Sequence, residues 1–302
     1  MYDLMIVGAG PAGMTAALYA LRAGKSVLLL DGSGYGGQIA QSQGVENYPG
    51  IPFVNGMDLA DSLMGQIRDL GVDFRFENVT DVNAIEKGYY EVRTDAARYE
   101  GRTVILATGL QHRKLNAPGE DRWVGRGISF CAVCDGAFFR QKEVAVIGGG
   151  NTAIQDALYL AEICAKVYLI HRREGFRAEI ALLEKARAND RIEFITNTVV
   201  AEFCGDTAFT GVRLENKQTG ELRELAVAGV FEAVGLEPRN QPFAKLIPLD
   251  GEGYAQADEG CGTPLPGVFV AGDCRAKKVR QLTTATADGT VAALAALEFL
   301  DR

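Results

Sequence analysis

The chain has 302 residues, of which 47% are hydrophobic and 23% are charged, as is usual for a globular protein with substantial cores. Its 31 Lys and Arg residues are outnumbered by 39 Asp and Glu residues, and the net charge of -8 argues against a general nucleic-acid binder. No apolar run approaches the length of a membrane helix, and a predicted buried strand near residue 1 leaves no room for a signal peptide. We therefore expect a cytoplasmic protein of two domains, with no membrane contact.

The first elements follow a βαβ pattern. An apolar strand over residues 4–7 precedes a glycine turn, a helix over residues 11–23 and a strand over residues 26–30. The change from a continuous apolar run to helical spacing and back is typical of a buried parallel sheet. Gly8, Gly10 and Gly13 have the spacing of a dinucleotide-binding turn, in which the glycines allow a tight turn, close approach of a pyrophosphate and close helix packing.

Two cysteines then lie in the segment Phe130-Cys-Ala-Val-Cys-Asp-Gly136. Cys131 and Cys134 are spaced to close a small disulfide ring. A structural zinc site needs four ligands, usually from two such pairs, and the sequence has no second pair and only two histidines, so we predict no metal site. In a chain without an export signal a single close pair favours a redox-active disulfide over a structural one. Cys164, inside an apolar helical pattern, is predicted to be a small buried hydrophobe.

The βαβ pattern begins again at residue 143, so the chain contains an internal repeat. A strand over residues 143–147, glycines at 148–150, a helix over residues 152–163 and a strand over residues 166–170 follow in order. Gly148 and Gly150 fill the first two glycine positions, and Ala153 fills the third. We predict an α/β fold with two Rossmann-like, three-layer dinucleotide-binding domains.

The two copies differ where their second strand ends. Asp31 lies 23 residues after Gly8, whereas the residue 23 positions after Gly148 is His171. Three arginines follow this histidine, namely Arg172, Arg173 and Arg177. An aspartate accepts hydrogen bonds from ribose hydroxyls and repels a phosphate, whereas guanidinium groups suit a 2′-phosphate, so we predict FAD in the first site and NADPH in the second. The alternatives are a solvated basic patch and an ordinary loop aspartate.

The last part of the chain is too short to be a further domain of this type. A linker near residues 237–242 leaves about 60 residues, with a turn at 250–254, a strand over 267–271 and a helix from about residue 283. We predict that these residues complete the first domain. The FAD-binding domain then comprises residues 1–113 and 241–302, and the inserted NADPH-binding domain comprises residues 114–240 and carries the cysteine pair.

Over essentially its whole length the chain resembles the low-molecular-weight, bacterial-type thioredoxin reductases, which are FAD- and NADPH-dependent pyridine nucleotide-disulfide oxidoreductases. The resemblance rests on both glycine turns, the Cys-Ala-Val-Cys-Asp-Gly segment, the arginine-rich segment, Gly36-Gly-Gln-Ile39, Glu46-Asn-Tyr-Pro-Gly50, Ala107-Thr-Gly109 and Gly267-Val-Phe-Val-Ala-Gly-Asp273. Together with the first turn it implies an FAD site of Gly8, Gly10, Pro11, Ala12, Gly13, Asp31, Gly36, Gly37, Gln38, Asn47, Ala107, Thr108, Gly109, Gly272, Asp273, Arg280 and Gln281. The expected NADPH site comprises Gly148, Gly150, Asn151, Thr152, His171, Arg172, Arg173 and Arg177.

The resemblance also implies how the cysteines work. Cys134 is expected to face the flavin, Cys131 to attack the disulfide of a thioredoxin-like protein, and Asp135 to supply or accept the proton. A homodimer is implied, as is rotation of the domains about hinges near residues 113–118 and 237–241. The alternatives are another disulfide partner, oxygen as the electron acceptor, and a non-enzymatic NADPH-sensing flavoprotein.

One departure from the family pattern is a basic stretch after Asp273. It contains Arg275, Lys277, Lys278 and Arg280. Such a stretch could meet an acidic partner, but we predict that most of it is solvated, apart from the arginine expected beside the flavin.

Overall fold

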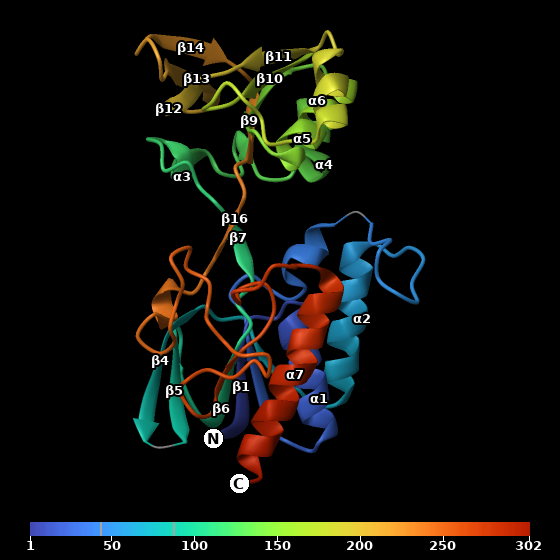
Figure 1. The fold of residues 1–302 in the computed structure, drawn as a ribbon, viewed down its shortest axis with the longest axis vertical. Helices are drawn as coiled ribbons and strands as arrows, with labels where there is room; N and C mark the ends of the chain where they lie inside the picture. The colour runs from blue at the N-terminus through green and yellow to red at the C-terminus, as the bar shows by residue number, and fades with distance from the viewer. Residues whose placement is uncertain (43, 87) are drawn as a thin grey trace. The chain divides into compact units, whose positions relative to one another are not determined.

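The computed structural model describes residues 1–42, 44–86 and 88–302. These residues fall into two compact units, one made of residues 1–111 with 237–302 and the other of residues 112–236. In Figure 1 the first unit contains both the blue and the red end of the chain, and the second runs from green to orange. Two chain segments connect the units, and their short strands β7 (Leu110–His112) and β16 (Leu236–Pro238) pair with each other.

The first unit contains a seven-stranded sheet whose central strands are parallel. Its order is β3 (Asp73–Arg75), β2 (Val27–Leu30), β1 (Tyr2–Val7), β6 (Arg98–Leu106), β5 (Tyr89–Thr94) and β4 (Val79–Glu86), and β17 (Val268–Val270) pairs with the second half of β6. All four residues of β2 are buried, because apolar layers cover both faces of the sheet. The C-terminal strand β17 thus belongs to the same sheet as the N-terminal strand β1.

Three helices cover one face of this sheet: α1 (Pro11–Arg22), α2 (Gly56–Asp69) and α7 (Leu282–Leu300). Helix α7 lies against α1 through alanines of both helices, and this lets the two backbones come close. At the contact, a Cβ on Gly289 would lie 2.2 Å from the carbonyl oxygen of Ala12. A segment that begins with η3 (Gln241–Phe243) and continues through Ala257 packs on the other face of the sheet. The C-terminal residues therefore complete the core of the first unit.

The second unit repeats this architecture with a parallel sheet of order β11 (Ile192–Ile195), β10 (Lys166–Ile170), β9 (Glu143–Gly148), β15 (Gly229–Ala233) and β8 (Ile128–Ser129). One core cluster joins it to α4 (Ala132–Asp135), α5 (Asn151–Ile163) and α6 (Ile180–Arg187). Another joins it to α3 (Glu120–Trp123) and to the antiparallel sheet β12 (Thr198–Gly205), β13 (Phe209–Asn216) and β14 (Leu222–Ala226). The predicted fold class is confirmed, although the sequence did not indicate the short elements β8 and α4.

Two carboxyl groups lie in the core of the second unit. Glu232, on β15, is 2% exposed, and neither of its side-chain oxygens has a hydrogen-bond partner among the described residues. Glu120 is 3% exposed and accepts hydrogen bonds from the backbone N–H groups of Leu115 and Ala117. Burial first, and then the neighbouring carboxyl group of Glu120, raise the pKa of Glu232 to about 8. Glu232 therefore carries a proton at neutral pH.

This proton makes the stability of the second unit depend on pH. Because the pKa of Glu232 rises from 4.5 to about 8 on folding, the folded chain binds a proton that the unfolded chain releases between these two values. The free energy of unfolding should therefore fall as the pH rises from about 5 to 8. Above pH 8 the whole decrease in the free energy of unfolding should be present. The substitution Glu232→Gln should remove this part of the slope and stabilise the protein by about 4 kcal/mol more at pH 9 than at pH 5.

Urea unfolding of the wild-type chain and the variant at pH 5 and pH 9 measures the difference. The matched control is Glu224→Gln, on the exposed side of β14, which should leave the slope unchanged. Identical slopes for the wild type and Glu232→Gln would contradict the prediction.

Candidate functional site

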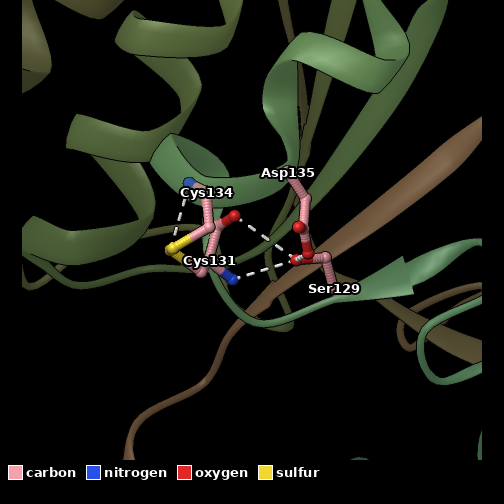
Figure 2. Close-up of a disulfide and its surroundings, with 4 residues drawn as sticks. All are labelled: Ser129, Cys131, Cys134 and Asp135. Atoms are coloured by element: carbon pink, nitrogen blue, oxygen red, sulfur yellow. Dashed lines mark hydrogen bonds between the residues drawn. A yellow bond between two sulfur atoms is a disulfide. The ribbon is translucent and has the colours of Figure 1, made fainter. Parts of the chain in front are cut away.

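A disulfide joins Cys131 and Cys134 at the start of α4 (Figure 2). The two Cα atoms are 5.3 Å apart, and the backbone N–H of Cys134 donates a hydrogen bond to Sγ of Cys131 over 3.2 Å. Cys134 is exposed and Cys131 is half-buried. The predicted cysteine pairing is therefore present, in a position where solvent reaches at least one of its residues.

Asp135 follows the disulfide directly, and its carboxylate turns toward Ser129 (Figure 2). The hydroxyl of Ser129 donates to Oδ2 of Asp135 over 2.6 Å and accepts a hydrogen bond from the backbone N–H of Cys131 over 3.0 Å. The backbone N–H of Asp135 in turn donates to the carbonyl oxygen of Cys131 over 3.1 Å. Sequence reasoning found Asp135 but missed Ser129, whose only signal was its place two residues before the first cysteine.

An aromatic contact lies on the other side of Cys131 in the sequence. The rings of His112 and Phe130 are stacked, with their centroids 5.0 Å apart and their planes 18° apart. Burial lowers the pKa of His112, so this ring is neutral at physiological pH. Beyond Asp135, Phe138 in η2 (Gly136–Phe139) is 74% exposed. The disulfide segment is thus held by packing on one side and carries an exposed apolar side chain on the other.

The first glycine turn, in the first unit, is shaped by backbone contacts. Gly8 has a φ of +108°, and a Cβ there would lie 2.2 Å from the carbonyl oxygen of Ala107. A Cβ on Gly13 would lie 1.9 Å from the carbonyl oxygen of Gly8. A Cβ on Gly10 would meet only the Cα of Gly37, at 4.0 Å, so the space above Gly10 is open. Two glycines are therefore required for packing, and the third leaves room for a ligand.

Asp31, at the end of β2, is tied to this turn. Its Oδ2 accepts a hydrogen bond from the N–H of Ala9 over 2.9 Å, and its Oδ1 accepts one from the N–H of Ser33 over 2.8 Å. Asp31 and Gly8 also line a pocket of about 420 Å³ at this edge of the sheet, within the usual size range of ligand sites. The carboxylate oxygens keep further acceptor capacity toward that pocket.

Other predicted residues of the first site form side-chain hydrogen bonds within the first unit. The Asn47 side chain donates to Oε1 of Gln281 over 3.3 Å, and Gln38 donates to the carbonyl oxygen of Leu110 over 3.1 Å. Thr108 lines the pocket and donates to the buried side chain of Asn240 over 3.0 Å. The remaining predicted positions occupy turns and helix starts: Pro11 and Ala12 begin α1, Gly36 and Gly37 begin η1 (Gly37–Gln41), and Gly109 and Gly272 have positive φ.

The second glycine turn, in the second unit, has one contact that the prediction did not include. A Cβ on Gly148 would lie 2.4 Å from the carbonyl oxygen of Ala233, as the tight turn requires. The prediction assigned the close approach of a pyrophosphate to Gly150, where a Cβ would meet nothing within 4 Å. It assigned no role to Gly149. The structure places the ring of His171 2.2 Å from where a Cβ of Gly149 would lie. His171 therefore lies under the turn, where it is 8% exposed and burial lowers its pKa.

The three arginines after His171 are exposed. Within the part of the chain that the structure describes, none of them forms an ion pair or a side-chain hydrogen bond. The end of their loop is fixed to α5, because the Asn151 side chain exchanges two hydrogen bonds with Glu179, over 2.9 Å and 2.8 Å. Thr152 is exposed in the first turn of α5. The guanidinium groups of Arg172, Arg173 and Arg177 thus keep their donors available to an anion.

Comparison with known proteins agrees with this arrangement. The family model for pyridine nucleotide-disulphide oxidoreductases matches residues 2–289. Thioredoxin reductases of Listeria monocytogenes and Bacillus subtilis are 41% and 38% identical over 302 residues, covering 100% of this chain and 94% and 95% of theirs. The crystal structure of Lactococcus lactis thioredoxin reductase is similar with a TM-score of 0.86 and 39% identity, covering 100% of this chain and 99% of that one.

The chain belongs to the thioredoxin reductase family. Like its relatives it is a pyridine nucleotide-disulphide oxidoreductase by sequence, and its redox disulfide occupies the segment that the motif predicted. In the described part of the chain no helix has the length and apolar character needed to span a bilayer. Nor does any group of three or more possible metal ligands lie together among those residues.

In the first unit, one carboxylate oxygen of Asp273 is buried. Its Oδ1 has no hydrogen-bond partner in the described structure, and burial raises its pKa. The guanidinium group of Arg280 donates to the carbonyl oxygen of Asp273 over 3.1 Å and lies over the ring of Tyr254, 3.9 Å from its centroid. A buried acceptor that receives no hydrogen bond fits a ligand hydroxyl better than it fits an empty core.

Most of the basic stretch after Asp273 is not solvated, contrary to the prediction. Arg275 and Lys277 both pair with Asp288 of α7, over 3.1 Å and 2.9 Å. The same carboxylate accepts a hydrogen bond from the N–H of Gly272 over 3.1 Å, and Lys277 lies 3.7 Å from Oδ1 of Asp273. The acidic partner of these cations therefore lies within the chain, and only Lys278 of the stretch is fully exposed.

Removal of this central carboxylate should destabilise the protein. The substitution Asp288→Asn leaves Arg275 without a countercharge and Lys277 with only the more distant Asp273 in a largely buried network. The free energy of unfolding should therefore fall by about 2 to 4 kcal/mol. Denaturant unfolding at pH 7 measures the loss. The matched control is Asp301→Asn, whose partner Lys25 lies at 3.0 Å but whose side chain is exposed, and its cost should stay below about 1 kcal/mol. Equal effects of the two substitutions would contradict the prediction.

Proposed function

We propose that the chain is an NADPH-dependent thioredoxin-disulfide reductase. The observation that carries the proposal is an accessible disulfide with a hydrogen-bonded carboxyl group beside it, in the same unit as a dinucleotide turn and three unpaired arginines. The overall reaction would convert NADPH, a proton and a thioredoxin disulfide to NADP⁺ and a thioredoxin dithiol.

The first unit is proposed to hold FAD. The open space above Gly10, the pocket beside Asp31 and the buried oxygen of Asp273 that accepts no hydrogen bond support this assignment. The N-terminus of α1, which no side chain caps, suits the pyrophosphate. A flavin bound there would supply the two-electron chemistry that connects a nicotinamide to a disulfide.

The second unit is proposed to hold NADPH. Its turn leaves Gly150 open, and the exposed Arg172, Arg173 and Arg177 offer donors for a 2′-phosphate. The buried position of His171 supports a role beneath the turn, where it shapes the backbone that a pyrophosphate would approach.

The cysteines would act in sequence on the partner. The thiolate of Cys131 attacks one sulfur of the partner's disulfide, so that a mixed disulfide forms and one partner sulfur leaves and takes a proton. Cys134 then attacks Sγ of Cys131, which restores the bond between the two cysteines and releases the second partner sulfur, again with a proton. Asp135 is the proposed donor and acceptor of protons when the enzyme's own disulfide is reduced and re-formed.

The partner is proposed to be a thioredoxin, as in the named relatives. The exposed ring of Phe138, three residues after Asp135, supports a protein substrate, because it places apolar surface beside the disulfide. A homodimer in the cytoplasm is proposed on the family resemblance alone.

Turnover assays test the function directly. NADPH and NADH oxidation are followed with and without thioredoxin, for the wild-type chain and for Cys131→Ser. We expect NADPH oxidation that depends on thioredoxin and disappears in the variant. Oxidation that proceeds without thioredoxin and yields hydrogen peroxide would instead assign oxygen as the acceptor. Protein that stays colourless after reconstitution with FAD would refute the flavin assignment.

The arginines should select the phosphorylated nucleotide. Each charge-assisted hydrogen bond contributes roughly 1.5 to 3 kcal/mol, so Arg172→Ala and Arg177→Ala should each raise the KM for NADPH about tenfold or more and leave that for NADH unchanged. Steady-state kinetics with both nucleotides measure this. The control is Arg187→Ala, exposed in the last turn of α6, which should change neither value. Parallel changes for both nucleotides would count against a 2′-phosphate site.

Asp135 should matter for one half-reaction only. The substitution Asp135→Asn removes the proton donor, so reduction of the disulfide should slow by about 100-fold, while reduction of the flavin by NADPH stays nearly intact. Stopped-flow flavin absorbance separates the two steps. Equal slowing of both steps would refute the role.

A further inference from the structure

We propose that Ser129 is a positioning residue for the redox disulfide: it holds the carboxyl group of Asp135 against the backbone of Cys131 in both protonation states of the acid. The inference rests on the proposed function in one respect, namely that Asp135 exchanges protons with the cysteine pair. Neither the glycine turns nor the arginines enter it.

Ser129 is well fixed in the second unit. It is the last residue of β8, it pairs with Phe231 of β15 in the central sheet, and it is 8% exposed. Asp135, in contrast, lies at the end of the four-residue helix α4, whose only internal support is a single turn. The hydrogen bond from Ser129, which the sheet holds in place, therefore restrains the side chain of Asp135.

The serine oxygen connects the acid to the cysteine backbone. Figure 2 shows Ser129 between Asp135 and Cys131, with dashed lines to the backbone of Cys131. The 2.6 Å contact between Oγ of Ser129 and Oδ2 of Asp135 has the length of a charge-assisted O–H···O⁻ bond, so the serine hydrogen points to the carboxylate. The same oxygen accepts the N–H of Cys131 over 3.0 Å.

A hydroxyl can serve the acid in either protonation state, because it both donates and accepts. With Asp135 ionised, Ser129 donates to it. With Asp135 protonated, the carboxylic acid can donate to Oγ, and the serine hydrogen can turn to the carbonyl oxygen of Cys131, which lies 3.3 Å away. The bond from the N–H of Cys131 is kept in both arrangements. Ser129 thus lets Asp135 gain or lose a proton without a shift of the segment that carries the disulfide.

A double-mutant cycle tests whether Ser129 acts through Asp135. Disulfide reduction is measured in the wild-type chain, Ser129→Ala, Asp135→Asn and the double variant. We expect Ser129→Ala to slow the step about tenfold in the wild-type background and by less than about twofold when Asp135 is already Asn, because interacting residues are not additive. Equal slowing by Ser129→Ala in both backgrounds would overturn the proposal, as would no slowing in either.

A pair of isosteric substitutions distinguishes loss of the hydroxyl group from a general effect on folding. Ser129→Thr keeps the hydroxyl and Ser129→Val replaces it with a methyl group, and both side chains are suited to a strand. The disulfide of the Ser129→Thr variant should be reduced about tenfold faster than that of the Ser129→Val variant. The two variants should have equal midpoints of thermal unfolding. Equal rates for Thr and Val would overturn the proposal whether or not Ser129→Ala folds.

The readout is independent of nicotinamide and flavin. Dithiothreitol reduces the Cys131–Cys134 bond by thiol–disulfide exchange, giving its own cyclic disulfide and two protein thiols, which are counted by alkylation and mass spectrometry at fixed times. If the wild-type chain fails to reduce thioredoxin but the cycle shows coupling, the proposed function is wrong and the role of Ser129 stands. If turnover is normal and the cycle is additive, only the role of Ser129 is wrong.

Discussion

The parallel direction of the central strands is the constraint on which the other features depend. Carboxyl ends of parallel strands meet at one edge of a sheet, so residues far apart in the chain come together there. In the first unit this brings Gly8, Ala107 and Ala271, the residues that follow β1, β6 and β17, to one edge. In the second unit the same edge collects the glycine turn after β9, His171 after β10 and the cysteine segment after β8. The disulfide therefore belongs to the functional edge of a sheet, although it lies in a short helix.

Charge is distributed differently in the two units. In the first unit cations and anions neutralise one another in a largely buried network centred on Asp288, which connects the turn at Gly272 to α7. A network of this kind fixes the position of the turn, and its paired charges are not free to bind another molecule. In the second unit the loop at 172–177 presents guanidinium groups with no internal countercharge among the described residues. An arginine that pairs with a buried carboxylate stabilises the fold, whereas the arginines proposed to bind a nucleotide have no such partner.

The redox segment combines reactivity with a rigid support. The hydrogen bonds of Ser129, Cys131 and Asp135 run within seven residues of chain, but the strand that anchors them is held by β15, about 100 residues later in the sequence. A disulfide that opens and closes needs local freedom, whereas proton transfer needs a fixed donor. Attachment of Asp135 to the sheet and of the cysteines to a single helical turn suits both the proposed proton transfer and a disulfide that opens and closes.

The sequence by itself determined the two βαβ units, the glycine turns, the cysteine pair and the contrast between Asp31 and the arginines, because each depends on residues close together in the chain with a fixed period or spacing. Tertiary structure alone decided that Arg275 and Lys277 meet Asp288, that His171 lies beneath Gly149, and that Glu232 is buried beside Glu120. It also placed Ser129 against Asp135. Burial and partner identity at these positions depend on which elements pack together, and the strand and helix periods of a sequence contain no information on that pairing.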